Sequence, residues 1–450
     1  MKHHLNLLLI AAALCSAASL AACAAPSTDS GEPIHLRIDV DRNVLPCDTP
    51  ERAVVKICLD GMKLPRRDRR PPVNLALVID RSGSMAGDKL EKAREAALEA
   101  LNQLAPDDLL SLVVYDSEVQ TLIPARRVGD GRAIERAIRS ICAGGNTALF
   151  GGVSQGASEI RRHVENRRYV HRVILLSDGL ANVGPSSPEE LGRLGAALRK
   201  EGISVTTIGL GLGFNEDLMT RLAERSDGNT YFVESSRDLP RIFAAELGDV
   251  LNVVARRVII EIEFPDGVRP VGLVGREGSI RGRKAEITLN QLYGGQEKYA
   301  LIEVEVDPTE AGAEREIARA RVSFEDALTQ RNAILTATRK VQFSGRREVV
   351  VASADHRVQT DYAQNVIAVA KDKAVELVDD GRRDEAAKEI RQKAAELQAM
   401  AETYGNASVK QAAAAMAPEA YKLEQDGLSN AERKAYRADS AQTRNQQSSR

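Results

Sequence analysis

The stretch Val73-Asn74-Leu75-Ala76-Leu77-Val78-Ile79-Asp80-Arg81-Ser82-Gly83-Ser84 decides the fold of this chain. The residues before Asp80 are almost all apolar, which is typical of a strand buried on both faces in the middle of a parallel sheet. An aspartate ends this run, and two serines follow within one short loop. Open α/β sheets bind ligands at the carboxyl ends of their strands, so the stretch predicts an oxygen-rich site at that edge.

Two later segments offer further oxygen donors. Gly144-Gly145-Asn146-Thr147 presents a threonine hydroxyl from a glycine-rich loop, and Val173-Ile174-Leu175-Leu176-Ser177-Asp178 reads as a second buried strand that ends in an aspartate. Hard cations such as Mg²⁺ prefer oxygen ligands in a near-octahedral shell. The candidate metal ligands are therefore Asp80, Ser82, Ser84, Thr147 and Asp178.

This set of five residues resembles the metal-ion-dependent adhesion site (MIDAS) of von Willebrand factor type A (VWA) domains, and it matches that pattern in order. The resemblance covers about residues 70–250. It implies a doubly wound sheet with strand order 3-2-1-4-5-6, a bound Mg²⁺ (or Mn²⁺ or Ca²⁺), and a protein partner that presents Asp or Glu to the ion. A domain of this fold whose site stays empty in the cell is the alternative.

The pattern outside this region predicts other folds. Apolar and polar residues alternate over 34–64 and again over 253–346, as in antiparallel strands with one buried face. Together they predict one β-sandwich into which the α/β domain, at 70–250, is inserted. This layout resembles bacterial lipoproteins related to inter-alpha-trypsin-inhibitor heavy chains and to so-called calcium-activated channel homologues. Residues 355–404 predict a helical hairpin, and the polar segment 429–450 predicts a disordered tail.

The N-terminus reads as a targeting segment. Residues 1–22 combine a short polar start with an apolar run too short to span a bilayer, which indicates a signal peptide. The ending Leu20-Ala21-Ala22-Cys23 resembles a bacterial lipobox and predicts a lipid on Cys23, with a polar linker over 23–33. Ala24 then favours the outer membrane of the cell envelope. An ordinary signal peptide, with Cys23 incidental, is the alternative.

Charge and cysteine usage limit the partners and the covalent structure. The formal net charge is −2, so there is no bulk electrostatic case for binding nucleic acid. Cys47 and Cys58 lie close enough in sequence for a disulfide in an oxidising compartment. Two separate thiols are equally open, because the sequence does not give the separation of their α-carbons.

Two segments resemble motifs of enzymes, but neither matches the sequence and structural context that its motif requires. Gly152-Val153-Ser154-Gln155-Gly156 matches a nucleophile elbow but lies inside a helical pattern. Gly209-Leu210-Gly211-Leu212-Gly213 follows a strand, yet Phe214 replaces the last glycine of a dinucleotide site. The sequence thus predicts a metal-dependent adhesion protein that is not an enzyme. A structural envelope scaffold whose metal only stabilises the fold, and a metal-dependent hydrolase, are the alternatives.

Overall fold

The apolar run at Val73 forms the central strand of a six-stranded sheet in a computed structural model, which describes residues 33–63 and 70–449. The order of the strands is β6-β5-β4-β7-β8-β9, and all pairs are parallel except β5 with β6. This confirms the predicted order 3-2-1-4-5-6. The six strands are β4 (Val73–Asp80), β5 (Leu109–Tyr115), β6 (Val119–Arg127), β7 (Val170–Ser177), β8 (Ile203–Leu210) and β9 (Thr230–Val233).

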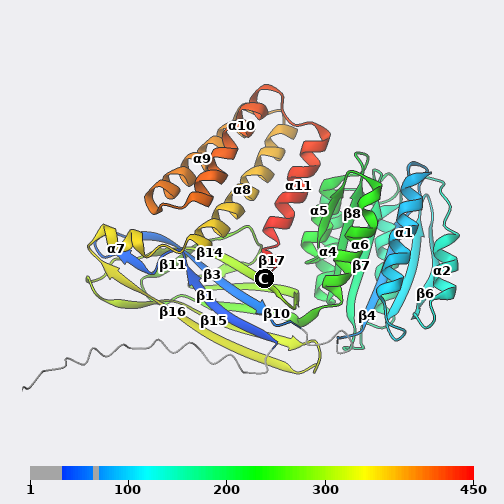
Figure 1. The fold of residues 1–450 in the computed structure, drawn as a ribbon, viewed down its shortest axis with the longest axis horizontal. Helices are drawn as coiled ribbons and strands as arrows, with labels where there is room; N and C mark the ends of the chain where they lie inside the picture. The colour runs from blue at the N-terminus through cyan, green and yellow to red at the C-terminus, as the bar shows by residue number, and fades with distance from the viewer. Residues whose placement is uncertain (1–32, 64–69, 450) are drawn as a thin grey trace, which may run out of the picture. The chain divides into compact units, whose positions relative to one another are not determined.

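Helices cover both faces of this sheet (Figure 1). Leu75 and Leu77 of β4 join one hydrophobic cluster with α1, α2 and α6, whereas Ala76 and Val78 join a second with α3, α4 and α5. A strand buried on both sides needs apolar residues at successive positions, which explains the unbroken run. The helices are α1 (Asp88–Gln103), α2 (Arg132–Arg139), α3 (Leu149–Arg161), α4 (Pro188–Lys200), α5 (Glu216–Arg225) and α6 (Leu239–Val250).

The strands before and after this domain form the predicted β-sandwich. One sheet has the order β1-β3-β14-β11 with β17 beside β14, and the other has the order β12-β13-β10-β15-β16-β2. Apolar side chains of both sheets meet in one cluster. The strands are β1 (Ile34–Val40), β2 (Val44–Pro46), β3 (Glu51–Gly61), β10 (Val253–Glu263), β11 (Val268–Val274), β12 (Ser279–Arg281), β13 (Lys284–Tyr293), β14 (Gln296–Val306), β15 (Glu314–Asp326), β16 (Asn332–Ser344) and β17 (Gln447–Ser449).

The two cysteines considered for a disulfide are free thiols in the structure. Cys58 is buried with Val54 and Val358 on the face of β3 that α8 covers. Cys47 instead packs at the edge of the cluster between the two sheets. Because the two thiols belong to clusters on opposite faces of a sheet, the structure has them as two separate thiols and not as a disulfide.

The C-terminal region holds more helices than the sequence predicts. The expected hairpin is present as α8 (His356–Asp379) and α9 (Arg383–Tyr404), after a short α7 (Arg347–Ala352). Two further helices, α10 (Ala407–Gln425) and α11 (Asn430–Arg444), complete the group. Helix α11 packs against both α8 and α5, as Figure 1 shows.

The prediction of a disordered tail over 429–450 is therefore wrong. Ser429 and Glu432 form a capping box at the start of α11, and β17 then pairs with β14. The segment is polar, and several of its charged side chains pair with carboxylates of other elements. Arg433, for example, pairs with Asp217 of α5 and Asp379 at the end of α8, each at 2.6 Å.

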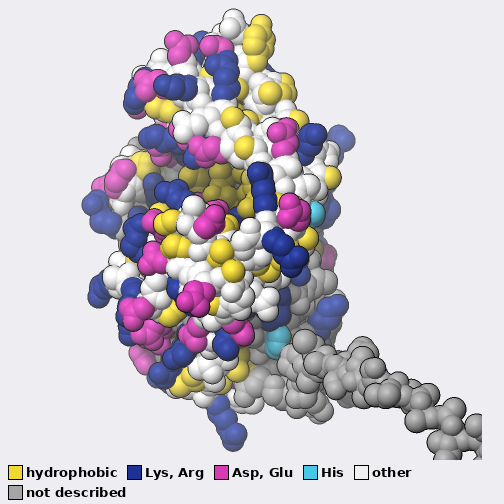
Figure 2. Space-filling model, turned by 90° about the vertical axis from the view of Figure 1, so that its left-hand side faces the viewer, with side chains coloured by type: hydrophobic (Ala, Val, Ile, Leu, Met, Phe, Trp, Pro, Cys, Tyr) yellow, Lys and Arg dark blue, Asp and Glu magenta, His cyan; other side chains and the backbone are white. Residues whose placement is uncertain are grey.

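The surface in Figure 2 carries basic and acidic side chains side by side and has apolar side chains in a central recess. Interspersed charges of both signs give this face a weak long-range field. Among the described residues, no helix combines the length and apolar character needed to cross a bilayer. The predicted signal peptide, Cys23 and nearly all of the linker lie outside the described residues.

Candidate metal site

Asp80 lies at the base of the candidate site, at the last position of β4. Its side chain is fully buried. One carboxylate oxygen accepts a hydrogen bond from the Ser82 backbone N–H at 2.8 Å, and the other accepts from the Ser177 hydroxyl at 2.7 Å. These two bonds fix the orientation of the carboxylate, because each oxygen has a defined donor.

The serines of the loop meet the aspartate of the second strand. The Ser82 and Ser84 hydroxyl oxygens are 3.1 Å apart, and Ser84 Oγ donates to Asp178 Oδ1 at 2.7 Å. Asp178 comes directly after β7, which pairs with β4 in parallel register. The carboxyl ends of the two adjacent strands therefore bring Asp80 and Asp178 to the same edge of the sheet.

Thr147 completes the group from a third segment. The glycine-rich loop docks on the first loop through two backbone hydrogen bonds, from Gly83 N to Gly145 O at 3.0 Å and from Gly144 N to Arg81 O at 2.8 Å. Thr147 is buried, and its hydroxyl faces Gly179, where an added Cβ would lie 3.1 Å from Thr147 Oγ1 and 3.6 Å from Ser84 Oγ. The structure thus brings all five predicted residues to one place.

The charges and donor atoms of this place fit a hard divalent cation. Burial and the nearby negative charge of Asp178 raise the pKa of the Asp80 carboxyl. The five side chains supply carboxylate and hydroxyl oxygens only, which is the ligand chemistry that Mg²⁺, Mn²⁺ and Ca²⁺ prefer. A divalent ion bound there would neutralise the two buried carboxylates. The site has two carboxylates, and no group of three or more His, Cys, Asp or Glu residues that could hold a metal occurs in the described ranges.

The site is open on one side. Asp80, Ser82, Thr147 and Asp178 are buried, whereas Ser84 and its neighbour Gly83 are exposed. A bound ion would thus be held from beneath by protein oxygens and could be reached from solvent on the Ser84 side. This is the arrangement that a ligand atom from a partner requires.

Sequence reasoning missed three residues that shape the site. Ser177 orients Asp80, and Asn182 accepts a hydrogen bond from the Thr147 backbone N–H at 2.9 Å. Lys89, in the first turn of α1, places its ammonium 2.5 Å from Asp178 Oδ2. Ser177 could have been found, since it directly precedes Asp178, but nothing in the sequence shows that Lys89 turns toward the site.

The motif that resembles a nucleophile elbow has a packing role. Gly152 and Gly156 lie one turn apart on α3 and face the sheet. A Cβ at Gly152 would lie 2.6 Å from the Tyr115 ring, and one at Gly156 would lie 2.5 Å from Val78 Cγ2. The two glycines are needed because α3 approaches β4 and β5 very closely. Ser154 lies within this helix, not at the end of a strand, as expected.

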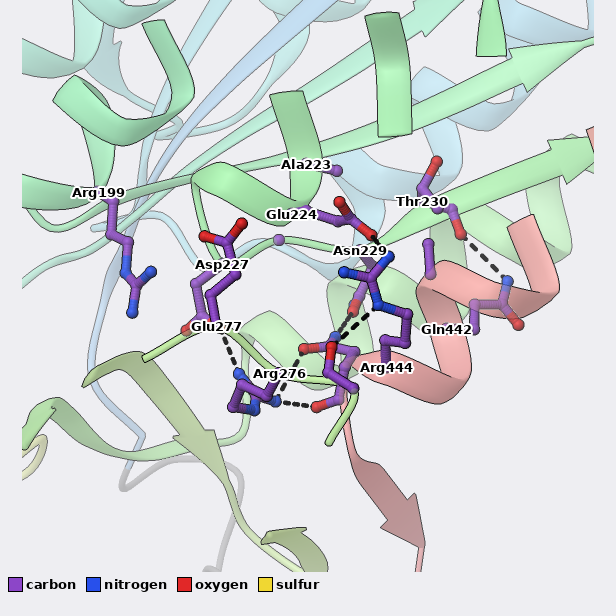
Figure 3. A pocket seen from close by; sticks show the side chains of 14 residues that line it. Arg199, Ala223, Glu224, Asp227, Asn229, Thr230, Arg276, Glu277, Gln442 and Arg444 are labelled. Carbon is purple, nitrogen blue, oxygen red and sulfur yellow. Dashed lines mark hydrogen bonds and ion pairs between the residues drawn. The ribbon is translucent and has the colours of Figure 1, made fainter. Parts of the chain in front are cut away.

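A second polar pocket lies among α5, the β11–β12 turn and α11, and none of the five candidate ligands lines it (Figure 3). Arg276 pairs with Asp227 at 3.4 Å. Arg444 of α11 pairs with Glu224 at 3.2 Å and donates to the Gly275 carbonyl at 2.9 Å. These arginines already have carboxylate or carbonyl partners, so the pocket is an internal network that ties α11 to the rest of the fold.

The comparisons with known proteins agree with this geometry. A family model for the von Willebrand factor type A domain matches residues 74–245. An uncharacterized protein of Synechocystis sp. is 29% identical over 279 residues, which is 60% of this chain and 65% of that protein. Human inter-alpha-trypsin inhibitor heavy chain H3 is 29% identical over 209 residues, which is 43% of this chain and only 22% of that protein.

A solved structure agrees over most of the fold. The von Willebrand factor type A protein from Catenulispora acidiphila aligns with 85% of this chain and 89% of its own, with a TM-score of 0.65 at 16% identity. The curated relatives extend beyond the part that this chain matches, since it covers less than two thirds of their length. VWA domains are typically metal-dependent modules of protein interaction, generally without catalytic activity. Residues 74–245 of this chain are a von Willebrand factor type A domain.

Proposed function

We propose that this chain is a divalent-metal-dependent protein-binding lipoprotein of a bacterial cell envelope. In this proposal Asp80, Ser82, Ser84, Thr147 and Asp178 hold Mg²⁺, Mn²⁺ or Ca²⁺, and the ion receives an Asp or Glu side chain from a partner protein. When bound, the ion supplies a positive charge partly stripped of water, to which a carboxylate binds more strongly than to a surface ammonium group.

One observation carries the proposal: the oxygen atoms of three separate segments converge beside an exposed opening. Ser84 Oγ lies 2.7 Å from Asp178 Oδ1, and its residue is exposed while Asp178 is buried. The buried residues hold the site in place, and the exposed serine marks where a partner enters.

The substitution Asp178→Ala tests the metal. Saturating Mg²⁺ should raise the melting temperature of the wild-type chain relative to EDTA, because an ion bound at a hundred times its Kd stabilises the folded state by about 2.7 kcal/mol. Asp178→Ala should abolish that rise. Asp130→Ala removes an exposed aspartate of the same domain and should keep it. A wild-type melting temperature that Mg²⁺ leaves unchanged would refute the metal site.

Partner capture separates adhesion from the scaffold alternative. A glutamate-containing peptide on a sensor surface should retain the chain in Mg²⁺ and release it in EDTA. The same peptide with glutamine should not retain the chain in either condition. If Mg²⁺ stabilises the chain but no acidic ligand is retained, the ion serves only the fold and the structural scaffold is favoured. Hydrolysis of a phosphoester or peptide that depends on Asp80 would instead favour the enzyme.

The envelope location rests on the sequence. Leu20-Ala21-Ala22-Cys23 directly follows an apolar run, as a lipidation signal requires, and Ala24 favours the outer membrane. Expression in a bacterium with a labelled fatty acid should label the wild-type chain and place it in the membrane fraction. Cys23→Ala should lose both the label and the membrane association. An unlabelled wild-type chain would remove the anchor from the proposal.

A further inference from the structure

Two large apolar side chains stand exposed at the rim of the metal site. Leu180 is 59% exposed and Leu212 is 51% exposed, and few large hydrophobic residues of the described chain are as accessible. Leu180 follows Asp178 and Gly179, and Gly179 lies against the Thr147 and Ser84 hydroxyls. Its position beside the ligands is therefore fixed by the short chain that connects it to Asp178.

Leu212 approaches from a different loop, between β8 and α5. A Cβ built on Gly213 would lie 2.6 Å from the Asp178 carbonyl oxygen, and one on Gly211 would lie 3.9 Å from Lys89 Nζ. Leu212 stands between these two glycines, and its side chain is exposed. The loop is anchored beneath by Phe214, which is buried in the core and whose carbonyl accepts a hydrogen bond from Lys434 at 2.5 Å.

The rim beside the glycine-rich loop is polar. Arg81 and Asp116 form an ion pair at 3.0 Å there, and the Asn146 backbone N–H donates to Ser117 at 2.9 Å. Isolated exposed leucines are common on protein surfaces, but two that flank one functional site form an apolar edge that a partner can cover. The rim therefore has an apolar side and a polar side, and a ligand that covers the apolar side gains affinity.

The charges around the ion favour one further anion. Asp80 and Asp178 carry two negative charges, and Lys89 contributes one positive charge at 2.5 Å from Asp178. A divalent ion added to this group leaves a net positive charge that a single carboxylate cancels. The ligand that fits both the charge and the rim is an acidic side chain with apolar neighbours.

We infer that the site recognises an Asp or Glu flanked by apolar side chains in a partner protein, and that Leu180 and Leu212 select those flanks. This inference rests on the proposed function, because it needs the bound ion to hold the carboxylate. Leu180 and Leu212 touch the flanking residues, and the oxygens beneath them hold the ion that takes the carboxylate itself.

Three immobilised peptides test the inference with the full chain in saturating Mg²⁺. They are Gly-Leu-Glu-Leu-Gly, Gly-Ser-Glu-Ser-Gly and Gly-Leu-Gln-Leu-Gly. The chain should bind the leucine-flanked glutamate at least about fivefold more tightly than the serine-flanked one. The reason is that contacts with two leucines remove apolar surface from water. The glutamine peptide should not bind. EDTA should release the chain from both glutamate peptides.

The double variant Leu180→Ser, Leu212→Ser should erase the difference between the first two peptides and keep the rise in melting temperature with Mg²⁺. Leu328→Ser is the matched control, because Leu328 is 40% exposed in a turn of the sandwich. Equal binding of the leucine- and serine-flanked glutamates by the wild type would overturn this inference and leave the proposed function standing. So would a double variant that still prefers leucine flanks. A wild type that Mg²⁺ does not stabilise would refute the proposed function itself.

Discussion

At the scale of single residues, the candidate site combines a buried base with one exposed side chain. Asp80 is held by Ser82 and Ser177, so its carboxylate is oriented without any ion. The sequence could predict the five ligands, because they follow strand ends in a fixed order. It could not predict Lys89, since the contact with Asp178 depends on how the first turn of α1 is placed in space.

Lys89→Met should strengthen the binding of Mg²⁺. The Lys89 ammonium lies 2.5 Å from Asp178 Oδ2, where it competes with a divalent ion for the same carboxylate. Removing a half-exposed positive charge at this distance should lower the Kd for Mg²⁺ by about threefold to tenfold, as measured by isothermal titration calorimetry.

Lys92→Met on the same helix provides the control for that experiment. Lys92 pairs with Glu95 and makes no contact with the site, so its loss should leave the Kd for Mg²⁺ unchanged. If Lys89→Met and the wild type bind Mg²⁺ equally, Lys89 does not compete with the ion.

At the scale of elements, the strands and helices of the VWA domain follow the sequence closely. The regular alternation of apolar strands and amphipathic helices suffices because each element buries a face against its neighbours. The tail is different. Helix α11 buries few large apolar residues, and its partners Asp217 and Asp379 lie far away in sequence. The composition of such a segment predicts that it is solvated, and only the fold shows that its charges are paired.

Strand β7 carries a buried histidine that should make stability depend on pH. Burial, together with the positive charges of Arg256 and Arg257, lowers the pKa of His171 to about 4. The unfolded chain would bind a proton near the ordinary pKa of about 6.5, so the unfolded state holds more protons between these values and stability falls on acidification. Lowering the pH from about 7 to about 5 should cost about 2 kcal/mol.

Denaturant unfolding of the wild type and of His171→Gln at both pH values would check this. The variant has no imidazole to protonate at this position, so its loss of stability on acidification should be smaller by that amount. Equal losses in the two proteins would show that other groups, and not His171, govern the acid sensitivity. His171 lies beside Asn74 of the neighbouring strand β4, so the substitution also changes a contact within the sheet. The loss on acidification is therefore measured for each protein relative to its own stability at neutral pH.

At the scale of the whole molecule, α11 joins the VWA domain to the C-terminal helices. Lys434 is buried, and its ammonium pairs with Glu216, contacts the Phe214 carbonyl at 2.5 Å and lies 4.3 Å from the Phe214 ring centre. Residues that follow the last predicted helix therefore hold the loop that carries Leu212. The β-sandwich and its inserted domain were predictable from alternating patterns, but this connection was not, because it consists of single long-range contacts.

Lys434→Met should destabilise the chain by about 3 kcal/mol, since it leaves the buried Glu216 without one of its two cations. Chemical denaturation should show this as a lower midpoint. Lys422→Met breaks an exposed pair with Glu432 and should leave the midpoint unchanged. If Lys434→Met unfolds at the same midpoint as the wild type, the contacts of Lys434 contribute no stability to the chain.

The pairing of β3 with β14 joins Asp60 to Glu297 across the entire inserted domain. Contacts between residues so far apart in sequence form late, because the long chain between them must first close into a loop at an entropic cost. A chain that emerges with its N-terminus first, whether from the ribosome or from an export channel, presents β1 and β3 as a hairpin whose outer edge has no partner until the β14 segment follows. Such an edge invites pairing with other chains. The inserted VWA domain can thus complete its fold before the β-sandwich that surrounds it in sequence. During that interval the emerging chain is most in need of a chaperone.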